Sequence, residues 1–178
     1  MNISYKSVLS AVALVAAGLG FCASSAHAQL TSGNTIMTVT VVDVLALTVA
    51  VPAVPIGMGS LTEFQSGSGF TAPAQLIASS NQPYDVKVRS NGDLVGTLTA
   101  AGSSIPISNI MVQTSPTAAG TFGSALSLSS TDQVLISNAP AGMVKTYDVK
   151  YSTAANNAAF YVKGGAYVAT LTYSIAAH

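Results

Sequence analysis

Side-chain character alternates over residues 167–175, within the C-terminal stretch 165–178, and this alternation limits the folds open to the chain. Successive side chains of a β-strand point to opposite faces, so valine, threonine and serine would share one face. The other face would carry Tyr167, Ala169, Leu171, Tyr173 and Ile175. The pattern predicts a half-buried strand, because β-branched and aromatic residues suit a pleated surface. Gly165 gives the chain the freedom to turn into this strand.

Similar short stretches recur upstream and predict further strands. The Asn91-Gly92 pair predicts a tight hairpin between two of them, since both residues tolerate positive φ. Residues 56–73, rich in glycine and serine, predict a long irregular connection, and no helix is expected after residue 28. The expected strands cover 35–50 (two consecutive strands or one bent strand, with a break at Val42-Asp43), 75–79, 84–90, 94–100, 105–114, 125–129, 133–137, 145–153 and a short segment at 159–163.

This spacing of strands and turns predicts a single all-β domain over residues 29–178. We expect an immunoglobulin-like antiparallel β-sandwich of about eight or nine short strands. Tyr84, Tyr147, Tyr167 and Tyr173 fall on the faces assigned to the core, so we expect packing there rather than a carbohydrate platform.

The first 28 residues have the layout of a secretory signal peptide. Lys6 precedes an apolar run over residues 8–21, and Ala26-His27-Ala28 forms a small-x-small cleavage site. The sequence therefore predicts export to the periplasm, cell surface or medium, with a mature chain that starts at Gln29. A transmembrane helix is disfavoured because the run is short for a bilayer. Lipid attachment at Cys22 is the other alternative, but the bulky Phe21 precedes it.

Composition excludes several classes of function. Cys22 is the chain's only cysteine, so the mature protein would hold its fold by packing, without disulfides. Five basic and six acidic residues follow position 28, which gives a net charge of −1. No basic patch for nucleic acid is expected.

The ionisable residues offer little catalytic or metal chemistry. The mature chain has one histidine, His178, so no Ser-His-Asp or zinc site is expected. Asp85 and Asp148 occur in matching Tyr-Asp-Val-Lys stretches, where pairing with lysine or solvation explains them better than catalysis. The remaining acids are too scattered for a calcium loop. We therefore expect no enzyme, no cofactor and no metal.

The ending resembles the terminal motif of fimbrial (pilus) subunits of the chaperone–usher type, with alternating apolar residues and a glycine, Gly165, fourteen residues from the end. The resemblance implies that a periplasmic chaperone holds the last strand, and that the N-terminal segment of one subunit completes the incomplete sandwich of its neighbour. The donor residues would then be Met37, Val39 and Val41. The acceptor side would be Leu171, Tyr173 and Ile175. Ala177 stands here in place of that family's penultimate tyrosine.

A second resemblance is to secreted bacterial surface proteins related to the WxL domain. It rests on Ser80-Asn-Gln-Pro-Tyr-Asp-Val86 and on Gly165-Ala-Tyr-Val-Ala-Thr-Leu-Thr-Tyr173, although the tryptophan of the name is missing. This resemblance implies a module that binds cell-wall or surface glycan.

Two functions therefore stay open, with an enzyme the least favoured class. The first is an exported structural or surface subunit that assembles by strand pairing with copies of itself or related subunits. The alternative is a cell-envelope or glycan-binding module.

Overall fold

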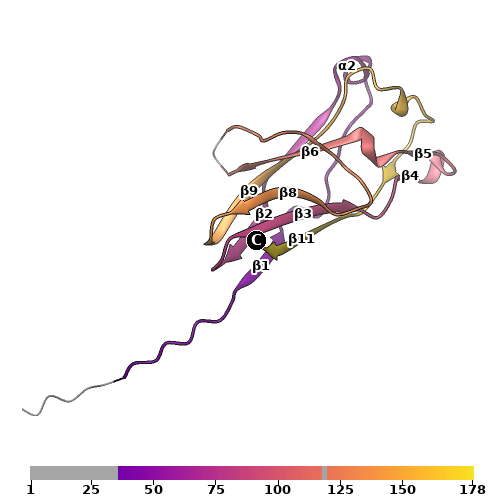
Figure 1. Cartoon of the computed structure of the whole chain (residues 1–178). Coiled ribbons are helices and arrows are strands. Elements are labelled where there is room, and N and C mark those ends of the chain that lie inside the picture. The colour runs from indigo at the N-terminus through magenta and orange to yellow at the C-terminus, as the bar shows by residue number, and fades with distance from the viewer. Residues whose placement is uncertain (1–35, 118–119) are drawn as a thin grey trace, which may run out of the picture. The chain divides into compact units, whose positions relative to one another are not determined.

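The computed structural model describes residues 36–117 and 120–178 (Figure 1). The chain divides into two units, residues 1–40 and 41–178. The predicted signal peptide, 1–28 with Cys22, lies outside the described residues. Residues 36–40, the described part of the first unit, have no regular secondary structure.

The second unit is built mostly from antiparallel strands (Figure 1). The largest sheet has the order β1 (Leu45–Val49), β2 (Gly69–Ser80), β9 (Gly142–Thr153), β6 (Ile110–Pro116) and β7 (Leu126–Ser127). A second sheet has the order β11 (Leu171–Ala177), β3 (Tyr84–Ser90) and β8 (Gln133–Ala139). A small third sheet joins β10 (Tyr167–Val168), β4 (Leu94–Gly96) and β5 (Ser104–Ile105). The helical turns are α2 (Leu61–Ser66), η1 (Leu98–Ala100), η2 (Ile107–Asn109) and η3 (Ala158–Phe160).

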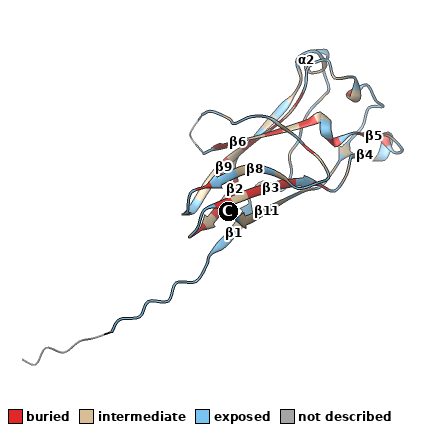
Figure 2. Cartoon of the chain, in the orientation of Figure 1, coloured by how far each residue is buried: buried red, intermediate tan, exposed pale blue. Residues whose placement is uncertain are grey.

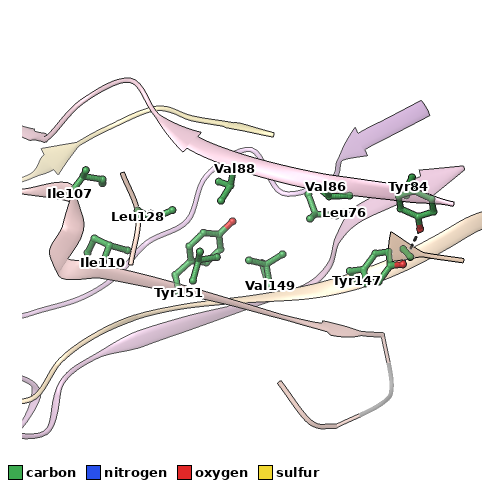
Figure 3. Close-up of a cluster of buried hydrophobic side chains, with 14 of the residues drawn as sticks. Leu76, Tyr84, Val86, Val88, Ile107, Ile110, Leu128, Tyr147, Val149 and Tyr151 are labelled. Atoms are coloured by element: carbon green, nitrogen blue, oxygen red, sulfur yellow. Dashed lines mark hydrogen bonds between the residues drawn. The ribbon is translucent and has the colours of Figure 1, made fainter. Parts of the chain in front are cut away.

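The core lies where the inward faces of β3 and β9 meet, as Figure 3 shows. Alternation places Tyr84, Val86 and Val88 of β3 inside, and β9 contributes Tyr147, Val149 and Tyr151. The hydroxyls of Tyr84 and Tyr147 are 2.8 Å apart and share a hydrogen bond between the two sheets. Buried residues follow β3 and β6 in Figure 2. The all-β, sandwich-like prediction is therefore confirmed, as is the core placement of the four tyrosines, with Tyr167 and Tyr173 half-buried against it.

The predicted Asn91-Gly92 hairpin is wrong. β3 pairs with β8 and β11, whereas β4 pairs with β5 and β10. Asn91 instead extends the ladder between β3 and β11, because its N–H donates to the Thr170 carbonyl at 2.9 Å and its Oδ1 accepts from the Thr170 N–H at 2.8 Å. The expected strand at 94–100 also ends early, at Gly96, and η1 follows it.

The irregular connection predicted for 56–73 is wrong in two places. β2 begins at Gly69, and a short helix, α2, forms at residues 61–66. Ser60 Oγ accepts from the Glu63 N–H, and Glu63 Oε2 accepts from the Ser60 N–H at 2.7 Å, which together make a capping box. The strand expected at 159–163 is also wrong, since η3 occupies residues 158–160. Of the strands expected within 35–50, the structure forms β1 at 45–49.

Candidate functional site

An apolar groove of about 750 Å³ opens along one side of the second unit. We call it the edge groove. One part of its lining is the segment from Val49 to Met58, just after β1, and another is the segment from Val162 to Tyr173. Core side chains supply much of the rest, namely Leu94, Ile105, Ile107, Ile110, Leu128 and Phe160. Lys163 is the one charged residue in this lining, so the groove suits an uncharged, apolar occupant.

Two strand edges in this part of the fold have no partner strand among the described residues. Within residues 36–117 and 120–178, β11 pairs with β3 alone. The Thr170 carbonyl accepts from Asn91, and the His178 N–H donates to the Pro83 carbonyl, so even-numbered residues direct their backbone groups toward β3. In an antiparallel ladder the alternate residues point the other way. The backbone N–H and C=O of Leu171, Tyr173 and Ile175 therefore point to the free edge.

The same reasoning applies to β1, the outer strand of the largest sheet. The Ala50 N–H donates to Gln75, and the Val44 carbonyl accepts from Asn81, so the even-numbered residues face β2. The backbone groups of Leu45, Leu47 and Val49 consequently point away from that sheet. Each edge offers a row of main-chain donors and acceptors to an added strand.

One polar spot interrupts the apolar lining, formed by Gln75, Tyr151 and Tyr173. The hydroxyls of Tyr151 and Tyr173 are 2.5 Å apart and share a hydrogen bond. Burial raises the pKa of both phenols, so both hydroxyls stay protonated at neutral pH. Gln75 is 1% exposed, and its Nε2 donates to the Val51 carbonyl at 3.0 Å. Its Oε1 has no hydrogen-bond partner within the described residues.

The structure places the predicted acceptor residues together on β11. Leu171, Tyr173 and Ile175 are half-buried and pack against the core. Gly165 also lines the groove, where a Cβ would lie 2.6 Å from the Ala100 Cβ and 2.9 Å from the Thr99 Oγ1. A larger residue at position 165 would push this wall away from η1.

The predicted donor residues lie outside the hydrophobic core. The side chains of Met37, Val39 and Val41 are 79%, 74% and 76% exposed. The chain becomes anchored just after them, because Asn81 Nδ2 donates to the Val42 carbonyl and Asn81 Oδ1 accepts from the Val44 N–H, both at 2.9 Å.

Sequence reasoning missed Gln75 and the groove wall at 49–58. Gln75 was assigned only to a short strand, and no functional site was expected at residues 49–58. A polar residue within the apolar stretch 72–78 was the available signal for the polar spot.

The described part of the chain gives little support for a metal site or a membrane-spanning helix. No cluster of three or more His, Cys, Asp or Glu side chains could hold a metal there. None of the helices in residues 36–117 and 120–178 is long and apolar enough to span a bilayer. Comparison with protein-family models gave no match, and comparison with curated proteins found no similar sequence.

Proposed function

We propose that this chain is a non-enzymatic, exported surface subunit of fimbrial type that assembles by β-strand addition. The edge groove receives an extended segment from a neighbouring copy, and residues 35–41 of each copy are the segment donated. The observation that carries this proposal is the apolar groove beside two strand edges whose outward backbone groups have no partner strand in the described part of the chain. The sandwich is then immunoglobulin-like but short of one strand.

The donated segment matches the groove in chemistry. Residues 35–41 carry no charge, and Met37, Val39 and Val41 share one face of an extended chain. Burying each of these side chains contributes roughly 1.5–3 kcal/mol, which supplies affinity, while main-chain hydrogen bonds add a generic term.

The donated segment directly precedes an anchored stretch. The Asn81 side chain holds the backbone of Val42 and Val44, near the start of the second unit. The side chains of Met37, Val39 and Val41 before this anchor are exposed, which leaves them available to a neighbouring copy.

The proposal also includes a partner protein that binds each subunit before it assembles. An open apolar groove with free strand edges is an aggregation hazard. A periplasmic chaperone that covers the groove would remove this hazard until a neighbouring subunit replaces it.

The test compares two charge substitutions on opposite faces of the donated segment. Val39→Asp would place a carboxylate in the groove, at a cost of several kcal/mol, whereas the side chain of Thr38→Asp points away from it. In sedimentation of the exported protein over a range of concentrations, we expect wild type and Thr38→Asp to form oligomers and Val39→Asp to stay monomeric.

Wild type that stays monomeric throughout, or equal assembly of both variants, would reject strand donation. Retention of that monomer on cell-wall glycan in a pull-down would then favour the glycan-binding module, the alternative function.

A further inference from the structure

Two large apolar residues, Val144 and Leu98, combine an exposed side chain with a backbone conformation that such residues rarely adopt. Their φ angles are 55° and 51°, in the left-handed region. The other non-glycine residues with positive φ in the described part of the chain are alanine or asparagine. A β-branched or bulky residue is strained there, whereas glycine or asparagine is not. Local backbone geometry therefore does not account for valine and leucine at these positions.

Packing within the chain does not account for them either. The side chains of Val144 and Leu98 are 69% and 91% exposed, and neither packs against the hydrophobic core. Met143, next to Val144, is also exposed. Backbone strain is concentrated at functional sites, and exposed apolar side chains that cluster mark contact surfaces. Both observations point to a partner that covers these side chains.

A β-bulge sets the direction of the Val144 side chain. Where β2 ends, two steps along β2 correspond to three steps along β9, from Gly142 to Lys145. Bulges of this kind often have glycine in the left-handed conformation, and they redirect a side chain. Here Val144 has that conformation, and its N–H donates to Ser79 Oγ at 3.0 Å. The bulge thus holds the backbone of Val144 in place while its side chain is exposed to solvent.

Val144 lies at the end of the second unit where the chain enters it. Gly142 pairs with Ser80, and Ser80 pairs with Leu45 at the start of β1. Val42, just before β1, is 70% exposed. We call this surface the entry patch, and it consists of Val42, Met143 and Val144.

Leu98 lies at the other end, beside the edge groove. Figure 1 shows β4, which η1 follows, far from the start of β1. The Thr97 N–H donates to the Ala166 carbonyl at 2.8 Å, and Thr99 Oγ1 donates to the Gly164 carbonyl at 3.3 Å. Both acceptor residues line the groove. The turn that carries Leu98 is therefore attached to the groove wall.

The donated segment is short enough to bring two copies into contact. An extended segment of residues 35–41 spans at most about 25 Å. Its last residue, Val41, directly precedes the entry patch of its own copy. When the segment occupies a neighbour's groove, the entry patch of the donor must therefore lie close to that groove and to the Leu98 turn beside it.

We propose that the entry patch of one copy packs against Leu98 of the next copy, with Val144 as its central residue. This inference rests on the proposed function and adds a contact between folded bodies to the donated strand. The two surfaces differ and lie at opposite ends, so the contact is heterologous. Repetition of such a contact extends a chain of subunits end to end, whereas a symmetric contact would close a dimer.

The first test replaces each strained residue with asparagine, which tolerates positive φ. We expect Val144→Asn and Leu98→Asn each to raise the dissociation constant of assembly about tenfold or more in sedimentation of the exported protein. The melting temperature of each variant, measured on dilute monomer, should stay equal to that of wild type or rise by about 2–4 °C, because the strain is removed.

Val134→Asn is the matched control. Val134 is an exposed valine on β8, away from the entry patch and from η1. Asparagine is unfavourable in a strand, so this variant should lower the melting temperature and leave the dissociation constant unchanged. The control thus has the opposite pattern to Val144→Asn and Leu98→Asn.

A cross-linking experiment tests whether the two surfaces meet. Proteins of residues 29–178 contain no cysteine. A mixture of the Val144→Cys and Leu98→Cys proteins, treated with a short thiol-to-thiol cross-linker, should give covalent dimers faster than a mixture of Val134→Cys and Leu98→Cys. Equal rates in the two mixtures would overturn the pairing of Val144 with Leu98.

The outcomes separate this contact from strand donation. Unchanged assembly of both asparagine variants, in a protein whose assembly Val39→Asp abolishes, would overturn the body contact and leave strand donation intact. A lower melting temperature of Val144→Asn or Leu98→Asn would show that the side chain serves its own fold, which also overturns the contact. Wild type that stays monomeric at every concentration would overturn both proposals.

Discussion

Carboxylates in this protein mainly hold loops through backbone N–H groups. Asp85 accepts from the Asn138 N–H at 2.8 Å, Asp148 from the Ala74 N–H at 2.8 Å, and Asp93 from the Ile107 N–H at 2.9 Å. Sequence reasoning expected Asp85 and Asp148 to be solvated or paired with lysine. The structure corrects this, because each carboxylate is used as a hydrogen-bond acceptor within the fold.

Asp85 gives a prediction about acid stability. The hydrogen bond from Asn138 and the contact with His178 hold the pKa of Asp85 below its usual value. A depressed pKa contributes stability above the unfolded-state value near 4, and this contribution is lost as pH falls through the folded value. We expect urea midpoints of wild type to fall between about pH 4 and pH 2, and Asp85→Asn to show a shallower fall. Identical pH profiles for the two proteins would contradict this role.

At the level of single elements, β11 makes the clearest prediction. Tyr173 is half-buried, and its hydroxyl shares a hydrogen bond with that of Tyr151. Thr172 is exposed and lies opposite Arg89 on β3. Tyr173→Asp should therefore lower the free energy of unfolding by about 3 kcal/mol or more, since it leaves a cavity and an unpaired carboxylate. Thr172→Asp should change it by less than about 0.5 kcal/mol. Equal losses in urea unfolding would mean that the assigned faces of β11 are wrong.

The elements also show what alternation could and could not predict. Apolar residues recur at alternate positions in β3, β9 and β11, because one face of each strand packs against the core. The hairpin predicted from the Asn91-Gly92 pair is wrong because the Asn91 side chain takes part in a long-range contact. Its Oδ1 accepts a hydrogen bond from the N–H of Thr170, a residue far along the chain. The helix at 61–66 was predictable in principle, since Ser60 and Glu63 have capping-box spacing.

The candidate site was predictable in part for the same reason. Period-two alternation predicted the inward face of β11, whereas Met37, Val39 and Val41 were predicted from the resemblance to fimbrial subunits. It could not identify the floor of the groove, which brings together side chains from several strands and from the helical turns. The unpaired Gln75 oxygen is likewise a property of the packed molecule, and no local pattern reports it.

For the whole molecule, the question is whether the second unit folds without residues 29–41, the proposed donor segment. Among the described residues, the buried core contains none before β1, and the Asn81 anchor begins at Val42. A protein of residues 42–178 should therefore still unfold cooperatively on heating, because its own core is complete apart from the open groove.

A peptide of residues 29–41 should then raise the melting temperature of this truncated protein. A ligand that binds only the folded state stabilises it by about 2.7 kcal/mol at one hundred times its dissociation constant. The same peptide with Val39→Asp should have little effect, because a carboxylate would enter the groove. Calorimetry of the truncated protein with each peptide measures both effects. A truncated protein that is unfolded at every temperature would show that residues 29–41 form an integral strand of their own domain, and the chain would then act as a self-contained module.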